Sequence, residues 1–201
     1  MSTPARRSRA EAKTATRAAV LRAAADVFAA RGFAGATVEE IAERAGFTRG
    51  AFYANFADKA DALLTILNEQ QAADMAEAAR LIAETPDDGK LAALQSWYLD
   101  VSGDHRLEAA IGELASQPDQ AGAVRARLAA LKAGTRSVIA GSLRSYREAN
   151  DLTFPVDDDT VASFILALGD GLAAQRRLDP HAVPDDAFTT AVAYLWFGLN
   201  T

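Results

Sequence analysis

Residues 37–56 constrain what this chain can fold into more than any other segment, and they read TVEEIAERAGFTRGAFYANF. The first part of the segment places apolar residues at the 0, +3, +4, +7 spacing that forms one stripe on a helix: Val38, Ile41, Ala42 and Ala45. Thr37 precedes the stripe and Glu40 follows three residues later, which is the spacing of a capping box. The pattern therefore predicts a short amphipathic helix that begins directly after Thr37.

The second part of the segment predicts another short helix after a tight turn. Gly46 stands where a left-handed residue can end a helix without strain, and Thr48 can cap the next helix. Phe52 and Phe56, four residues apart, give this second helix an apolar underside. Its other faces carry Arg49, Gly50, Tyr53 and Asn55. Two helices joined by so short a turn cross steeply, as they do in a helix-turn-helix.

The flanking sequence adds a helix on each side of this pair. Before it, residues 14–31 are predicted to be helical and residues 32–36 to form a loop. The buried stripe of that first helix consists of Val20, Leu21, Ala24, Ala25, Val27 and Phe28. After the pair, Asp58 can cap a fourth helix. Lys59 then falls in the first turn of that helix, where backbone amides already favour an anion.

Taken together, these segments resemble the TetR family of bacterial transcriptional regulators over roughly residues 12–66. The resemblance is carried by the ARGF loop, the TVEEIAERAG helix, the TRGAFYANF segment and the DK pair that follows. It implies phosphate contacts for Thr37, Thr48, Tyr53 and Lys59. It also implies that a second set of residues faces the major groove of DNA: Arg49, Gly50, Ala54 and Asn55. A larger residue often stands in the family where this chain has Ala54, so we expect little base contact there.

Each of these features also has a plainer interpretation. A capped helix, a glycine and a second helix can be ordinary helical packing, because short motifs often match by chance. A tyrosine such as Tyr53 is often a half-buried spacer with its hydroxyl in water, and Lys59 alone would be a solvated charge. The flanking helices and the charge distribution make DNA binding the preferred interpretation.

Charge is distributed unevenly along the chain, in the direction that DNA binding requires. Residues 1–60 contain 10 Lys and Arg against 6 Asp and Glu, whereas residues 61–201 contain 11 against 21. The net charge of −6 therefore conceals a basic excess beside the motif, where it would approach the DNA backbone. Residues 1–12 carry Arg6, Arg7 and Arg9 and are interpreted as a basic disordered arm that reaches along DNA. A terminal tail without a role is the alternative.

The composition favours an all-α protein. Alanine dominates, which favours helix, and no alternating Val, Ile or Tyr run of strand length occurs. We expect about nine helices in two parts: a three-helix helix-turn-helix DNA-binding domain at residues 13–60, and a larger helical domain for effector binding and dimerisation at residues 61–201. The chain has no cysteine, which excludes disulfides and thiolate metal sites and suits a reducing cytoplasm. No apolar run reaches the roughly 18 residues of a membrane helix, and the N-terminus does not read as a secretory signal.

Beyond residue 60 the sequence predicts helices at residues 58–84, 91–101, 107–116, 121–149, 157–178 and 184–200. The last two have apolar faces wider than one stripe, so each needs more than one neighbouring element. The resemblance implies that they form a four-helix bundle with a second copy of the chain. The predicted interface consists of Phe164, Leu168, Leu172, Leu195, Trp196 and Leu199. Packing within a single chain is the alternative.

The resemblance also implies a small-molecule pocket inside the second domain. Its candidate wall residues are Trp97, Tyr98, His105, Phe164 and Phe188, because a pocket is mostly apolar with a few polar groups. A solvated loop position is the plainer interpretation for His105, and a core position for Trp97. The scarcity of basic residues in the apolar stripes favours a neutral or cationic ligand.

The sequence thus predicts a ligand-responsive DNA-binding transcriptional regulator. The preferred form is a repressor that binds a near-palindromic operator as a homodimer and is released by a small-molecule effector; control by a partner protein is the alternative. An enzyme is not expected, because the chain has two histidines, His105 and His181, and lacks a GxSxG motif, a glycine-rich phosphate loop and a His-x-x-x-His pair. We expect no cofactor or metal, no membrane partner, and action in the bacterial cytoplasm, on the nucleoid when DNA is bound.

Overall fold

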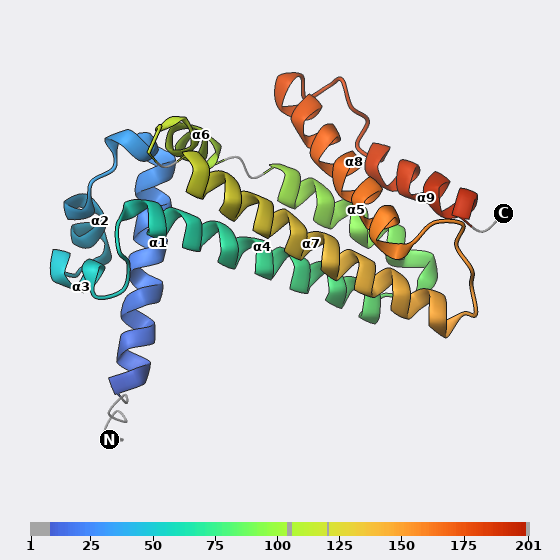
Figure 1. Cartoon of the computed structure of the whole chain (residues 1–201), viewed down its shortest axis with the longest axis horizontal. Coiled ribbons are helices and arrows are strands. Elements are labelled where there is room, and N and C mark those ends of the chain that lie inside the picture. The colour runs from blue at the N-terminus through green and yellow to red at the C-terminus, as the bar shows by residue number, and fades with distance from the viewer. Residues whose placement is uncertain (1–8, 104–105, 120, 200–201) are drawn as a thin grey trace. The chain divides into compact units, whose positions relative to one another are not determined.

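The computed structural model describes residues 9–103, 106–119 and 121–199 (Figure 1). Within these residues all regular structure is helical, which confirms the predicted all-α class. The helices are α1 (Arg9–Gly35), α2 (Val38–Ala45), α3 (Arg49–Tyr53), α4 (Lys59–Glu84), α5 (Asp87–Gly103), α6 (Glu108–Ser116), α7 (Ala121–Ala149), α8 (Asp158–Leu178) and α9 (Ala187–Leu199). No helix in these ranges combines the length and hydrophobicity that crossing a bilayer demands.

Most helix limits lie close to the predicted ones, but those of α1 and α5 differ. Helix α1 begins at Arg9, so the predicted disordered arm of residues 1–12 overlaps it, and it continues past a non-helical Gly32 to Gly35, where a loop over residues 32–36 was predicted. Helix α5 differs at its start. It begins at Asp87, directly after Pro86, whereas the sequence predicted a break over residues 86–89 and a start at residue 91. Proline is well suited to a helix start and carboxylates are favoured in a first turn. One glycine at position 89 weakens a helix by only about 1 kcal/mol, which these start signals overcome.

The chain divides into two compact units. The first comprises Met1–Glu69 with Arg106–Arg127, and the second comprises Gln70–His105 with Leu128–Thr201. Helices α4 and α7 therefore each contribute one end to each unit. The functional limits expected at residues 12–13 and 60–61 stay predictions, because these units reflect packing alone.

In the first unit, α1 packs against α2, α3 and α6 (Figure 1). The stripe predicted for α1 is buried at five of its positions, while Ala25 is partly exposed. The largest fully buried side chains of this unit are Phe28, Phe52, Ile41, Leu63, Leu114, Val20, Val27 and Val124. The Phe28 ring stacks on Phe33 with 5.9 Å between centroids, across the non-helical Gly32 inside α1.

A glycine allows α6 to join the end of α1. Gly32 has φ 69° and ψ −176°, a backbone conformation that is essentially restricted to glycine. A Cβ atom at this position would lie 2.4 Å from Oε1 of Glu113 on α6. The same carboxylate accepts a hydrogen bond from the Ala34 backbone N–H at 2.7 Å. Glu113 therefore occupies the space that a side chain at residue 32 would fill.

In the second unit, polar groups from distant parts of the sequence join α5 to α8 and α9. The Tyr98 hydroxyl donates to the Gly169 carbonyl at 2.9 Å, and its ring stacks on Phe188 at 4.2 Å between centroids. The side-chain amide of Gln95 donates to the Asp185 carbonyl, while its oxygen accepts from the Thr189 hydroxyl at 2.6 Å. Burial raises the pKa of Tyr98 and keeps its hydroxyl protonated for this bond.

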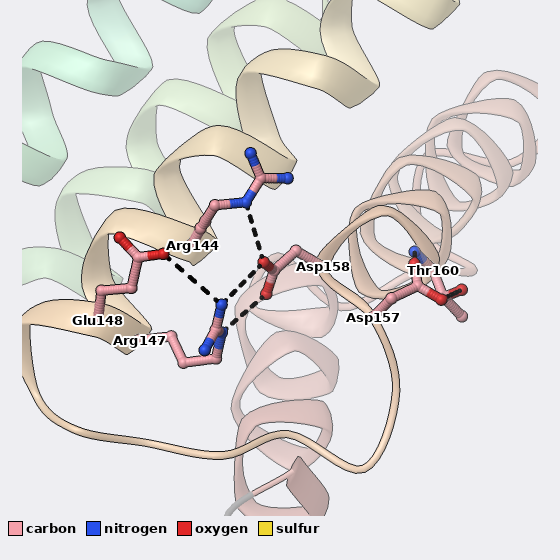
Figure 2. Close-up of polar contacts among 6 residues, drawn as sticks. All are labelled: Arg144, Arg147, Glu148, Asp157, Asp158 and Thr160. Carbon is pink, nitrogen blue, oxygen red and sulfur yellow. Dashed lines mark hydrogen bonds and ion pairs between the residues drawn. The ribbon is translucent and has the colours of Figure 1, made fainter.

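The start of α8 is held to the end of α7 by a buried carboxylate (Figure 2). Asp158 is 8% exposed and accepts from Arg144 Nε at 3.4 Å and Arg147 Nε at 3.3 Å. Its neighbour Asp157 caps the helix by accepting from the Thr160 amide and hydroxyl, each at 2.8 Å. These bonds lower the pKa of Asp157. The predicted acidic helix start is confirmed, and the structure adds the two arginines.

Candidate nucleic-acid interface

Backbone hydrogen bonds and one side-chain cap fix α2 at both ends. Thr37 Oγ1 accepts from the Glu40 backbone N–H at 3.1 Å, while the Glu40 carboxylate pairs with Arg31 at 3.4 Å. Gly46 adopts φ 75°, and the Phe47 N–H bonds back to the Ala42 carbonyl at 2.9 Å. This is the Schellman arrangement, in which a left-handed residue lets the last carbonyls of the helix find donors. The turn predicted from the sequence is confirmed.

Helix α3 is short and depends on its cap and one buried ring. Thr48 Oγ1 accepts from the Ala51 backbone N–H at 3.3 Å, which satisfies one of the otherwise unpaired amides at the helix start. Phe52 is fully buried, and its ring lies 5.6 Å from that of Phe56. With Phe52 facing inward, the opposite side of the helix is open.

The open side of α3 carries four residues predicted to meet DNA: Arg49, Gly50, Tyr53 and Ala54, all of them exposed. Arg49 Nη1 lies 2.7 Å from Oε1 of Glu39 on α2, and the guanidinium lies over the Tyr53 ring, 5.9 Å from its centroid. The hydrogen bond with Tyr53 and the charge of Glu39 raise the pKa of Arg49. A cation is therefore held in one place on the open face. Sequence analysis missed Glu39, since only the crossing of the two helices brings it to Arg49.

Asn55 is the predicted groove residue whose side chain is already engaged. Its Nδ2 donates to the Ala51 carbonyl at 2.8 Å, and its Oδ1 is buried without a hydrogen-bond partner in the described residues. The side chain thus lies against the end of α3. Base contact by Asn55 stays a prediction and requires the side chain to leave this position.

Lys59 makes contacts that the sequence did not reveal. Its Nζ donates to the carbonyls of Phe33 at 2.7 Å and Ala36 at 3.0 Å, and it lies 4.5 Å from the Phe33 ring centroid. The interpretation of Lys59 as a plain solvated charge is therefore wrong. An ammonium has three donors, so one is left for the phosphate contact that remains predicted. The carbonyl partners lie more than twenty residues upstream, beyond the reach of a local pattern.

The candidate pocket residues are placed differently from one another. Tyr98 and Phe188 are buried and stacked on each other, and their place in a pocket wall stays a prediction. Trp97 is partly exposed, but its Nε1 is buried and has no partner in the described residues. Phe164 is 51% exposed. His105 lies outside the described residues. No group of three or more potential metal ligands occurs within them either.

The predicted interface residues are mostly half-buried. Leu168, Leu172, Leu195 and Trp196 are partly exposed, and the Leu199 side chain lies outside the described part of the chain. Trp196 packs edge-on against Tyr146 at 5.1 Å and Phe154 at 5.4 Å, so part of its surface is used within the chain. Tyr194 on α9 is 76% exposed, more than any residue of the predicted set whose side chain the structure describes.

Comparison with known proteins identifies the family. The family model described as bacterial regulatory proteins, tetR family, matches residues 20–65, which hold α2 and α3. The HTH-type transcriptional repressor BepR of Brucella suis is 32% identical over 180 residues, covering 83% of this chain and 82% of that protein. The chain belongs to the TetR family.

Two further similarities concern parts of this TetR-family chain and its fold. The HTH-type transcriptional regulator TtgW of Pseudomonas putida is 45% identical over 67 residues, which span 33% of this chain and about half (49%) of that protein. The SmeT–triclosan complex, from the repressor of the Stenotrophomonas maltophilia efflux pump SmeDEF, has a TM-score of 0.67 at 24% identity. It covers 90% of this chain and 91% of SmeT. That similarity shows the fold.

The TetR-family chain is therefore a DNA-binding transcriptional regulator and not an enzyme. This agrees with the geometry of α3. A capped helix with a buried ring on one side and a held cation on the other suits insertion into the major groove.

Proposed function

We propose that this regulator is a repressor that binds a near-palindromic operator as a homodimer and leaves it when a small-molecule effector binds. The observation that carries the proposal is α3 itself, with Phe52 buried on one side and Arg49, Gly50, Tyr53 and Ala54 exposed on the other. The similarity to BepR, which is named a repressor, supports repression over activation.

The DNA contacts are divided by chemistry. Thr37 and Thr48 are exposed at the starts of α2 and α3, where backbone amides favour an anion, so we assign them with Tyr53 and Lys59 to phosphates. Arg49, Gly50, Ala54 and Asn55 are assigned to the major groove. Phosphate contacts position the protein without reading sequence, whereas groove contacts carry the discrimination between bases.

Two exposed aromatic side chains support the homodimer. Phe164 on α8 and Tyr194 on α9 are 51% and 76% exposed, and these two helices pack against each other. A twofold pair would cover such side chains and present two copies of α3 about 34–36 Å apart, one turn of DNA. One short helix reads few bases, so pairing would supply the missing specificity.

The effector is proposed to be a neutral, mostly apolar molecule with a hydrogen-bond acceptor. A buried polar atom without a partner requires an explanation, and the Trp97 Nε1 donor in α5 is such an atom. The SmeT–triclosan complex supports a ligand of this class. The effector has to favour the state that does not bind DNA, and a tenfold loss of affinity needs about 1.4 kcal/mol of coupling.

The experiment that tests the proposal is selection from a library of random duplexes by the purified chain. We expect the enriched sequences to contain two inverted half-sites. The affinity of the chain for them should fall steeply as the salt concentration rises. A thermal-shift screen of neutral apolar compounds follows, with release of the selected duplex as readout. If no sequence is enriched, the proposed recognition of an operator is wrong. Enrichment without any stabilising compound would favour a partner protein over an effector. Cytoplasmic action on the nucleoid follows from the same proposal.

Gly50 offers a variant that separates DNA approach from folding. A Cβ at Gly50 would meet only Thr48 Oγ1, at an ordinary 3.6 Å, so Gly50→Ala should fold and gain about 0.5–1 kcal/mol of helix stability. If the α3 backbone approaches the bases at this point, affinity for the selected duplex should fall about tenfold, measured by fluorescence anisotropy. Unchanged affinity would remove Gly50 from the groove set.

A further inference from the structure

We propose that Glu39 is a specificity-determining residue that positions Arg49 for one base of each operator half-site. This inference rests on the proposed reading role of α3. It assigns a function to an acidic residue on a surface that is expected to meet a polyanion, where a carboxylate would otherwise oppose binding.

The geometry holds the guanidinium between two helices. Glu39 is in the first turn of α2 and Arg49 is the first residue of α3. The 2.7 Å contact joins Glu39 Oε1 to Arg49 Nη1, and the Tyr53 ring, one turn further along α3, lies 5.9 Å from the guanidinium. The side chains of Glu39 and Arg49 are 57% and 59% exposed, so the fixed guanidinium remains open to a ligand.

The chemistry fits base reading. A guanidinium carries five donors in a rigid fork, and one carboxylate oxygen occupies only part of them. Guanine offers O6 and N7 as two neighbouring acceptors in the major groove, which a forked donor pair matches. A long side chain that is already held loses less rotamer freedom on binding than a free one. Glu39 therefore favours one direction for the arginine, and with it one position in the half-site.

Stabilisation of the fold explains the contact between Glu39 and Arg49 less well than positioning of the arginine does. Ion pairs this exposed contribute little to folding. An acid in the first turn of α2 is favoured by the helix dipole, but Glu40 shares that position and its carboxylate pairs with Arg31 at 3.4 Å. Glu39 and Glu40 thus have different partners but lie in the same turn of the same helix, with a similar electrostatic environment. Glu40 is a matched control.

The test compares Glu39→Gln, Glu40→Gln and Arg49→Ala with the wild-type chain in selection from one library of random duplexes. Arg49→Ala should lose the preference at one base pair of each half-site. Glu39→Gln should weaken the preference at that same base pair about fivefold to tenfold, whereas Glu40→Gln should leave it within about twofold. Both glutamine variants should bind non-specific duplex more tightly, because each removes one negative charge.

A double variant tests whether Glu39 acts through Arg49. Glu39→Gln in the Arg49→Ala background should cause no further loss of base preference, since Glu39 acts through Arg49. Identical profiles for Glu39→Gln and Glu40→Gln would overturn the positioning role, as would an unchanged preference in Arg49→Ala. Failure of the wild-type chain to enrich any sequence would instead remove the proposed function. Thermal unfolding of each variant shows that differences in folding are not the cause.

Discussion

The two compact units are stabilised in different ways. In the first unit, residues close together in the sequence end α2 and begin α2 and α3, as Thr37, Gly46 and Thr48 do. Four phenylalanines of this unit lie inside: Phe28, Phe33, Phe52 and Phe56. In the second unit, residues about seventy positions apart make the joining contacts, as Tyr98 and Gly169 do, and aromatic rings such as Phe164 stay exposed. Long-range contacts occur in the first unit as well, as between Glu113 and Ala34, but local signals set the limits of α2 and α3 there. In the second unit, exposed aromatic residues on packed helices suit a further partner.

The largest effect is expected from disturbing the backbone at Gly32 in the first unit. Gly32→Ala should lower the free energy of unfolding by about 3–5 kcal/mol, because it strains a positive-φ position and displaces Glu113 from the Ala34 N–H. Urea denaturation at fixed protein concentration measures this.

The control for that variant is another glycine of the same unit. A Cβ at Gly112 on α6 would meet nothing within 4 Å, so Gly112→Ala should stabilise the chain by about 0.5–1 kcal/mol. If both alanine variants left the stability unchanged, the local backbone would not be what defines the first unit.

The second effect concerns the exposed aromatic residues of the second unit. Phe164→Ser should raise the dissociation constant of the proposed dimer at least about a hundredfold, since a twofold interface loses a buried phenylalanine twice. Sedimentation analysis of a dilution series measures it. Leu178→Ser is the control, because Leu178 is 90% exposed at the end of α8. A monomeric wild-type chain would show that the second unit is complete without a partner.

The third effect tests how much the polar contacts between distant residues stabilise the second unit. Asp158→Asn should destabilise the second unit by roughly 2 kcal/mol, because two arginines lose a buried charged acceptor while Arg144 remains half-exposed to water. The exposed neighbour serves as control, and Asp159→Asn should change the midpoint of urea unfolding little. Equal midpoints for the two variants would contradict a joining role for Asp158.

The smallest effect is expected from removing the charge of Asp157, which caps α8 inside the second unit. Hydrogen bonds from Thr160 lower its pKa in the folded chain, so its contribution exists above the ordinary carboxyl pKa of about 3.9. The contribution disappears as pH falls through the lower folded-state value. The melting temperature of wild type should therefore exceed that of Asp157→Asn at pH 7, and the gap should close in acid. A gap that is constant with pH would rule out the charge as its source.

Sequence patterns predicted what depends on neighbouring residues. The caps at Thr37 and Thr48, the left-handed Gly46 and the acidic start of α8 follow from local hydrogen-bonding needs, and all are present. The contacts of Lys59 with Phe33 and Ala36 could not be predicted, because they arise only when α4 returns to the end of α1.

The same reason limits what the sequence says about the candidate pocket wall, which stays a prediction. Tyr98 looked like any aromatic residue at helical spacing, and its buried position depends on Gly169 and Phe188 arriving from other helices. Glu39 was similarly invisible as a partner of Arg49. Helix identity is a local property, whereas the use of a side chain is decided by which helices meet.

The brevity of α3 has a consequence for engineering. Phe52 is its only buried residue among the positions from Arg49 to Tyr53, so the neighbouring surface positions can be exchanged with little penalty to the scaffold. Libraries randomised at Arg49, Gly50 and Ala54, with Glu39 varied alongside them, should yield well-folded molecules with new operator preferences. The design freedom lies in this one exposed surface, and the anchoring ring beneath it should be left untouched.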